Sequence, residues 1–144
     1  MLVNLMTAAV RPDLGEVRLF GRSTGAIDDY DGWLAMLDGL GLVTERAVLL
    51  SQCSVAQNLA LPLTLEIDPI RPDLLPAVRA LADEVGLAPG ALDLAVGAAS
   101  PEVVQRVRFG RALALNPRLV VAEHPTATLP ASRWPGSRAI WLPS

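Results

Sequence analysis

Two side chains suited to chemistry stand next to each other late in the sequence, Glu123 and His124. They follow residues 119–122, an apolar run without alternation, which is typical of a strand covered on both faces in a parallel sheet. Pro125 ends that strand, so both side chains fall at its carboxyl end, where open α/β sheets bind their ligands. At such a place a carboxylate can hold a divalent cation, and an imidazole with a pKa near its ordinary value can accept a proton.

Plainer roles compete with this chemistry. His124 is the only histidine, and one histidine beside one carboxylate supplies too few ligands for a metal centre, so Glu123 alone is a weak metal candidate. The sequence also contains no loop that would position a phosphate group for His124 to act on. A structural role for His124 is therefore favoured over a role as a base.

The segment that must position these residues is a helix ahead of the strand. Ser100 is typical of an N-cap, Pro101 of the first helical position, and Glu102 complements the positive end of the helix dipole. Apolar residues cover most of the circumference of this helix, so we expect it to be largely buried, with arginine stems along apolar surface and their charges held out. Asn116 and Pro117 end it.

These residues carry a resemblance to a known family. Five short segments, 96–100, 105–107, 111–114, 116–118 and 123–126, resemble in sequence the signature-to-Walker-B region of ABC-transporter ATP-binding subunits. In that family the signature helix leads to an apolar strand that ends in Asp-Glu-Pro-Thr. Weaker similarity extends over nearly the whole chain. The resemblance implies an α/β fold, an incomplete P-loop-NTPase-like domain with a mostly parallel sheet and a helical subdomain. It also implies ATP and Mg²⁺ as cofactors.

The positions that would do the family's chemistry depart from its pattern. By the resemblance, Ser100 begins the signature segment, but Pro101 and Glu102 replace its glycines, which removes a donor and adds bulk and negative charge. Glu123 stands at the position of the Mg²⁺-directing aspartate and His124 at that of the general-base glutamate. We therefore expect no intact catalytic residue, with His124 a vestigial base position.

The nucleotide-binding positions are also altered. We expect a short helix over 2–10, stopped near Pro12. Its residues 2–6 resemble the helix after the family's phosphate loop, so the chain would begin just beyond that loop. The sequence contains no lysine, which the Gly-x-x-x-x-Gly-Lys loop requires. Glu45, at the end of a strand predicted over 41–45, stands where the family has a glutamine, and a carboxylate there can only accept hydrogen bonds. We expect Glu45, Ser100 and Glu123 to be vestigial nucleotide-binding positions; a solvated Glu45 is the alternative.

The uncharged segment 47–65 is long enough to suggest a membrane span. Its polar residues argue against one, because each would need a partner within lipid. Ser54 and Gln57 instead predict a capping box that opens a short helix to Leu61. The segment resembles the family's surface for a membrane permease, which makes four residues candidate partner contacts: Leu49, Leu50, Val55 and Leu59. Core packing is the other interpretation.

Composition places limits on the function. The chain has 144 residues and a net charge of −3 without a basic run, which suits one domain and argues against nucleic acid as a partner. Its single cysteine fits a reducing compartment. We expect a cytoplasmic protein at the inner face of the membrane.

An amphipathic helix is predicted over 73–85 and is ended by Gly86. This helix completes the predicted helical subdomain.

The sequence therefore predicts one ABC-ATPase-like domain over 1–144. Residues 46–116 form its helical subdomain and signature helix, 117–130 the Walker-B-like strand and loop, and 131–144 an irregular tail.

The first hypothesis is a degenerate ATP-binding subunit with weak or no ATP binding and hydrolysis on its own. The alternatives are a non-catalytic interaction or regulatory module that docks on a permease or a complete ATPase subunit, and an ATPase whose P-loop lies upstream of Met1. A homo- or heterodimer with another ATP-binding subunit is implied by the resemblance.

In the family the strand before the P-loop is normally central to the sheet, and the given sequence does not contain it. We therefore also expect an unpaired strand edge and self-association of the chain.

Overall fold

The computed structural model describes residues 2–27, 29–45 and 47–123. The chain divides into two compact units, residues 1–40 and 41–144. Each is described here by itself. Among the described residues, no helix has both the length and the apolar composition that a membrane crossing needs.

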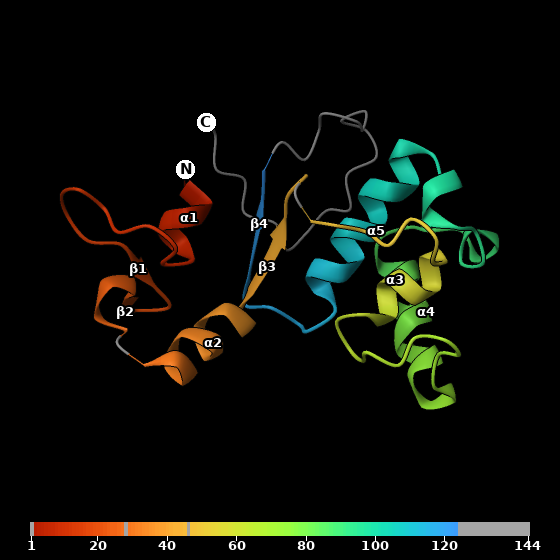
Figure 1. Cartoon of the computed structure of the whole chain (residues 1–144), viewed down its shortest axis with the longest axis horizontal. Helices are drawn as coiled ribbons and strands as arrows, with labels where there is room; N and C mark the ends of the chain where they lie inside the picture. Colours follow the sequence, from red (N-terminus) through yellow and green to blue (C-terminus); the bar gives the residue numbers. More distant parts are fainter. Residues whose placement is uncertain (1, 28, 46, 124–144) are drawn as a thin grey trace. The chain divides into compact units, whose positions relative to one another are not determined.

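The described residues of the first unit form two α-helices and a small hairpin: α1 (Leu2–Met6), β1 (Arg18–Leu19), β2 (Arg22–Ser23) and α2 (Tyr30–Asp38) (Figure 1). Strands β1 and β2 pair antiparallel through a turn in which Phe20 and Gly21 both have positive φ, the geometry of a two-residue hairpin loop. Asp29 caps α2 by accepting a hydrogen bond from the Gly32 amide. The indole of Trp33 donates to the Thr7 carbonyl, which ties α2 to the end of α1.

Helix α1 ends earlier than the sequence predicts. The hydroxyl of Thr7 donates to the Val3 carbonyl at 2.9 Å, and Ala8 then takes a positive φ. A left-handed residue cannot continue the α-helix, so the segment beyond Met6 forms a turn.

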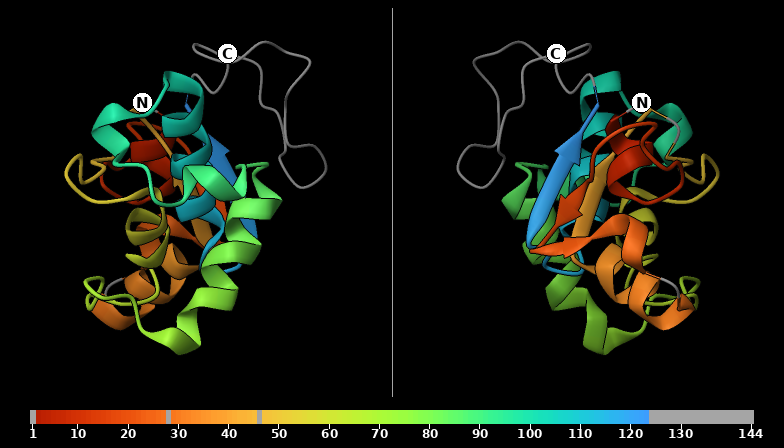
Figure 2. Two further views of the ribbon diagram at one scale, coloured as in Figure 1. Left: turned by 90° about the vertical axis from the view of Figure 1, so that its right-hand side faces the viewer. Right: turned by 90° about the vertical axis from the view of Figure 1, so that its left-hand side faces the viewer.

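In the part of the second unit that the structure describes there are two strands and three α-helices: β3 (Leu40–Val43), α3 (Val55–Ala60), α4 (Leu75–Glu84), α5 (Pro101–Leu113) and β4 (Leu119–Ala122). Short 3₁₀ turns occupy Pro72–Leu74, Pro89–Ala91 and Val96–Ala98. Strands β3 and β4 are hydrogen-bonded neighbours that run in the same direction (Figure 1). The α/β fold class is confirmed, and the α3, α4 and α5 helices pack on one another (Figure 2).

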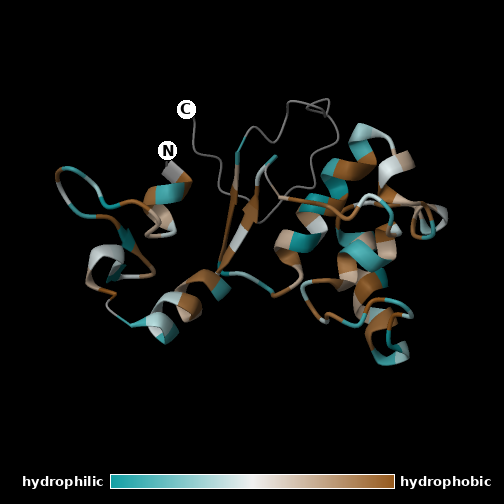
Figure 3. Cartoon of the chain, viewed as in Figure 1, coloured by the Kyte–Doolittle hydropathy of each residue, from teal (hydrophilic) through white to brown (hydrophobic). Residues whose placement is uncertain are grey.

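Helix α5 and strand β4 lie where the sequence predicts them. Ser100 is the N-cap of α5 and Pro101 its first residue. Strand β4 has the predicted bounds, but only Val120 is buried, whereas a strand covered on both faces was expected. Figure 3 shows apolar residues along this strand. Within the described residues β3 is its sheet neighbour, so its other side chains keep part of their exposure.

The core of the second unit lies among the three helices and the two strands. Its fully buried side chains include Val43, Val55, Leu59, Val78, Val85 and Val107. Gly110 lets α5 approach α3, because a Cβ at this position would lie 2.4 Å from a methyl carbon of Leu59. The predicted capping box is confirmed: Ser54 accepts from the Gln57 amide, and Gln57 accepts from the Ser54 amide.

Helix α4 and strand β3 differ from their predicted bounds by a few residues. The segment predicted as a helix over 73–85 begins as the 3₁₀ turn and becomes α-helical at Leu75, with Pro76 in its first turn. Gly86 follows with a φ of +70°, as the predicted helix end requires. Strand β3 runs from Leu40 to Val43, so Glu45 lies beyond it.

Candidate functional site

The carboxyl ends of β3 and β4 bring two of the predicted site residues to one edge of the sheet. Glu123 follows β4, and its amide donates to the Val43 carbonyl at 2.9 Å. Glu45 lies two residues beyond Val43 and is exposed, while Glu123 is half-buried. The sheet therefore places two carboxylates near its end. His124, which the sequence predicts to be a vestigial base position, lies outside the described residues.

Two carboxylates do not complete a metal site. No group of three or more His, Cys, Asp or Glu side chains that could hold a metal ion occurs in the described parts of the chain. Mg²⁺ keeps several waters and often binds through one or two carboxylates together with substrate phosphates. The metal role of Glu123 therefore depends on a bound phosphate group, and it stays a prediction.

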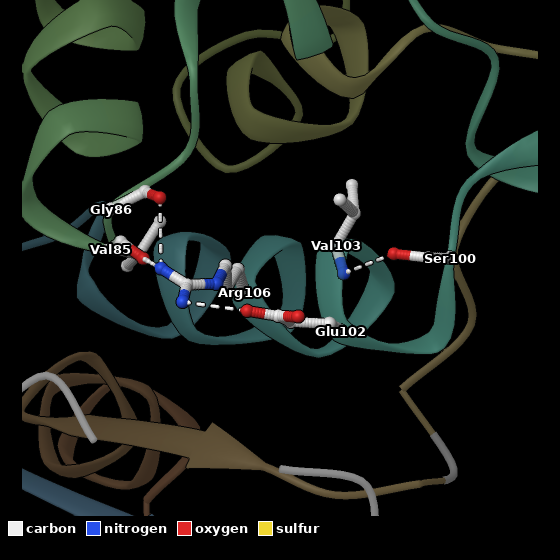
Figure 4. Close-up of polar contacts among 6 residues, drawn as sticks. All are labelled: Val85, Gly86, Ser100, Glu102, Val103 and Arg106. Carbon is white, nitrogen blue, oxygen red and sulfur yellow. Dashed lines mark hydrogen bonds and ion pairs between the residues drawn. The ribbon is translucent and has the colours of Figure 1, made fainter. Parts of the chain in front are cut away.

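The signature-like segment is a helix start whose polar groups bond to one another. The hydroxyl of Ser100 accepts from the Val103 amide at 3.3 Å, and the Ser100 carbonyl accepts from the Val104 amide (Figure 4). Pro101 has no amide hydrogen. A helix N-terminus binds anions through amides that have no other acceptor. The Val104 bond is the first regular bond of the helix, whereas the Ser100 hydroxyl takes up the Val103 amide, one of those that would otherwise lack an acceptor.

Glu102 adds a carboxylate to this first turn. Its Oε1 accepts from Nη2 of Arg106 at 2.9 Å, one turn along the helix. The bond to Arg106 holds the carboxylate near the helix start, and the Glu102 side chain is 35% exposed. Negative charge suits a helix N-terminus but repels a phosphate group brought to the same place. The residues present do not fit a triphosphate at this position.

Arg106 also links α5 to the end of α4. Its Nη1 donates to the carbonyls of Val85 and Gly86 at 2.7 and 2.8 Å (Figure 4). The sequence predicts that the arginines of α5 hold their charges out in solvent, which is wrong for Arg106, because its side chain is only 15% exposed. The carbonyl groups after α4 need a donor, and this guanidinium supplies it. One signal for this contact was available: Glu102 and Arg106 stand four residues apart on a predicted helix.

The segment before α3 is held in place by a buried amide. Asn58 is fully buried, and its side chain donates to the carbonyls of Leu50 and Ser54 and accepts from the Leu50 amide. Sequence reasoning missed this residue. A polar side chain inside an apolar helical stretch was the available signal, since buried amides are almost always hydrogen-bonded.

The four candidate partner contacts divide between core and surface. Val55 and Leu59 are fully buried, and Leu49 packs against the same core. Core packing, the other interpretation of these residues, describes them better. Leu50 is 40% exposed, and its neighbour Val48, which the sequence did not single out, is 77% exposed.

Arg111 supports the exposed part of this segment. Its Nη1 donates to the Val48 carbonyl at 2.7 Å. Burial lowers the pKa of the Arg111 guanidinium from its ordinary value. Because arginine stays charged at any physiological pH, the guanidinium remains a charged donor to the Val48 carbonyl. The residues Val48 and Leu50 thus form an apolar surface, called the 48/50 surface below, held from one side by Asn58 and from the other by Arg111.

Comparison with known proteins finds related sequences but no matching family model. Methionine import ATP-binding protein MetN 2 of Burkholderia mallei is 35% identical over 128 residues, which are 89% of this chain and 32% of that protein. Lipoprotein-releasing system ATP-binding protein LolD of Anaeromyxobacter dehalogenans is 34% identical over 128 residues, 89% of this chain and 53% of that protein. The chain spans about a third to a half of the length of these curated relatives.

Solved structures give the same fold. A dimeric bacterial ABC transporter cassette superposes with a TM-score of 0.73 at 24% identity, over 92% of this chain and 58% of that one. A nucleotide-free ATP-binding cassette from an ABC transporter gives a TM-score of 0.66 at 21% identity, over 88% of this chain and 53% of that one. These likenesses show the fold of an ABC ATPase cassette, of which this chain holds a part.

Proposed function

Because this chain is a partial relative of the ATP-binding subunits of ABC transporters and shares their fold, we propose that it is a degenerate member with weak or no ATP binding and hydrolysis on its own. In this proposal residues 1–144 correspond to a single ABC-ATPase-like domain. Glu45, Ser100 and Glu123 occupy vestigial nucleotide positions, and His124 occupies a vestigial base position.

One observation carries the proposal: the first turn of α5 is occupied by its own groups. Ser100 accepts from the Val103 amide, Pro101 has no amide hydrogen, and the Glu102 carboxylate is fixed there by Arg106. The absence of lysine from the sequence supports the same conclusion, because a lysine normally neutralises the β- and γ-phosphates. A triphosphate would meet negative charge in place of free donors.

Calorimetric titration of the whole chain with Mg-ATP tests this proposal. We expect no saturable heat under conditions in which an intact LolD-type subunit, titrated as the control, binds ATP. The same samples should show no phosphate release above buffer. Micromolar binding by this chain would overturn the proposal.

A second function is favoured by the 48/50 surface, namely docking on a membrane permease or on a complete ATP-binding subunit. Val48 and Leu50 are exposed apolar side chains on a segment that Asn58 and Arg111 hold rigid. Rigid apolar residues of this kind lose little conformational entropy when a partner covers them. The resemblance of this segment to the family's permease-facing surface supports the same assignment, with a cytoplasmic location at the inner face of the membrane.

Co-purification tests the docking function. We expect Val48→Asp with Leu50→Asp to abolish retention of a co-expressed permease or ATP-binding subunit in the absence of nucleotide. Leu65→Asp is the matched control, because Leu65 is 89% exposed in the same unit but lies outside the 48/50 surface. Equal loss in both variants, or no loss in either, would contradict the assignment.

An active ATPase that carries its phosphate loop upstream of Met1 is the remaining alternative. This chain covers only 32% and 53% of the length of the MetN 2 and LolD relatives, which supports this alternative. In-frame coding sequence upstream with a Gly-x-x-x-x-Gly-Lys loop, together with ATP binding by the extended protein, would favour it over the degenerate subunit. Pairing with another ATP-binding subunit in a homo- or heterodimer belongs to the same proposal.

A further inference from the structure

One face of α2, in the first unit, combines exposed apolar side chains with exposed acidic ones. Tyr30 is 70% exposed and Leu34 is 37% exposed. Because they stand four residues apart, they are neighbours on the helix surface. Asp31 and Asp38 are exposed too, and at about 100° per residue they fall on the same side of the helix. These four residues are called the α2 face below.

The other side of α2 is fixed to the rest of the first unit. Met36 is buried, and the indole nitrogen of Trp33 donates to the Thr7 carbonyl at 3.0 Å. The Tyr30 ring lies beside the Trp33 ring, with 5.9 Å between the ring centroids and 35° between the planes. The exposed tyrosine therefore rests on a side chain that is itself anchored, so covering it costs little conformational entropy. The face of a tyrosine ring also attracts cations.

The carboxylates of the α2 face have no basic counterpart in this part of the chain. Residues 23–45 include five acidic residues and no arginine or lysine. Among the described residues, neither Asp31 nor Asp38 takes part in an ion pair. Asp38 is also the last residue of α2, where negative charge opposes the helix dipole. The stability of the helix thus gains nothing from Asp38, whereas a cationic partner would.

Charge decides which partner suits this face. A second copy of the chain, bound through the same face, would bring like charges together, and these oppose association. Anionic lipid headgroups would be repelled for the same reason. A protein segment with arginine or lysine fits, because the methylene groups of those side chains can lie on Tyr30 and Leu34 while their charges reach the carboxylates.

We propose that the α2 face binds an amphipathic helix of a partner protein, with two arginine residues seven positions apart and apolar residues between them. Asp31 and Asp38 are themselves seven residues apart, which is about 10.5 Å along the helix axis. A partner helix lying along α2 repeats this distance when its cations have the same spacing. Its apolar residues, three and four positions after the first arginine, then meet Tyr30 and Leu34.

Fluorescence anisotropy of labelled peptides, titrated with the full chain, tests this proposal. The matched probe is an alanine-rich helical peptide of about 20 residues, with arginines at positions i and i+7 and leucines at i+3 and i+4. The shifted probe has the same composition, but its second arginine stands at i+9, on the opposite side of the peptide helix. We expect saturable binding of the matched probe, and binding of the shifted probe weaker by roughly three- to fivefold, the effect of one exposed ion pair. No saturable binding of the matched probe would overturn the proposal, and so would equal binding of both probes.

Charge variants locate the binding on α2. Asp31→Asn and Asp38→Asn each remove one charge at nearly constant size, and each should weaken the matched probe by roughly three- to fivefold. The double variant should no longer distinguish the two probes. Asp13→Asn is the matched control, because Asp13 is exposed in the same unit but lies outside α2. An equal loss in this control would show general attraction of a basic peptide to an acidic chain, and would contradict the assignment.

An apolar variant completes the test. Tyr30→Ala should weaken the matched probe, whereas Leu14→Ala, at a residue that is 93% exposed in the same unit, should leave its binding unchanged. Equal effects of the two substitutions would contradict contact with the Tyr30 ring. The ATP titration and the co-purification of the 48/50 variants do not depend on α2, so this proposal and the proposed functions fail separately.

Discussion

The body of helix α5 and its first turn lie on one element but in different environments. The body is packed: Val107 is fully buried, Phe109 nearly so, and Gly110 allows the close approach of Leu59 from α3. The first turn is exposed at Ser100 and Pro101 and is closed by its own hydrogen bonds. The body of the helix is thus packed against the core, while its first turn carries a proline without an amide hydrogen and a carboxylate that would repel a phosphate group. In this chain the scaffold and the nucleotide chemistry are separable.

The largest effect is expected where the body of α5 meets α3. Leu59→Ala should lower the free energy of unfolding by about 3 kcal/mol, because Leu59 is fully buried and its removal leaves a cavity. Leu65→Ala is the control, and its cost should stay within about 0.5 kcal/mol since Leu65 is exposed. Urea unfolding followed by circular dichroism measures both.

Gly110→Ala sharpens this prediction. Alone it should destabilise by about 1 kcal/mol, because the new methyl group would meet the Leu59 side chain. Combined with Leu59→Ala, the methyl group would enter the cavity, so the double variant should be more stable than the sum of the single costs predicts. Additive costs would contradict the close packing of α5 on α3.

The next effect concerns the link between α4 and the first turns of α5. Gly86→Ala should cost about 1–2 kcal/mol, because Gly86 has a positive φ and a Cβ there would lie 2.4 Å from Nη1 of Arg106. Gly90→Ala is the matched control: its Cβ would meet no atom within 4 Å and its φ is not positive. Equal melting temperatures for the two variants would show that Arg106 does not hold the end of α4.

The smallest effects are expected at the two serine N-caps. Ser54→Ala should cost about 1 kcal/mol, because its capping box satisfies the amides of both Ser54 and Gln57. Ser100→Ala should cost less than this, since its bond to the Val103 amide is 3.3 Å long and exposed. The difference between the two melting temperatures is the readout, and a larger loss at Ser100 would show that the first turn of α5 supports the core.

Local sequence rules predicted the elements whose signals lie within a few residues. Ser54 with Gln57, Ser100 with Pro101, and the apolar run of β4 each identified an element correctly, because caps and buried strands depend on neighbouring positions. The early end of α1 was missed, because Thr7 bonding back to Val3 leaves no simple pattern.

The candidate site was harder to predict, because its geometry depends on contacts between distant segments. Arg106 meets the end of α4, and Arg111 meets the Val48 carbonyl, although each pair is far apart in the sequence. The burial of Val55 and Leu59 likewise depends on α5 covering α3, which no local pattern reports. Glu45 and Glu123 were each predicted at the end of a strand, and the pairing of β3 with β4 places both at the same edge of the sheet.

Amide chemical shifts during a titration of the ¹⁵N-labelled chain with Mg-ATP test the central claim most directly. The self-capped helix start predicts that the Glu102, Val103 and Val104 amides keep their positions, together with those of Glu45 and Glu123. Saturable shifts at these amides would show that a triphosphate displaces the Ser100 cap, and would contradict the account.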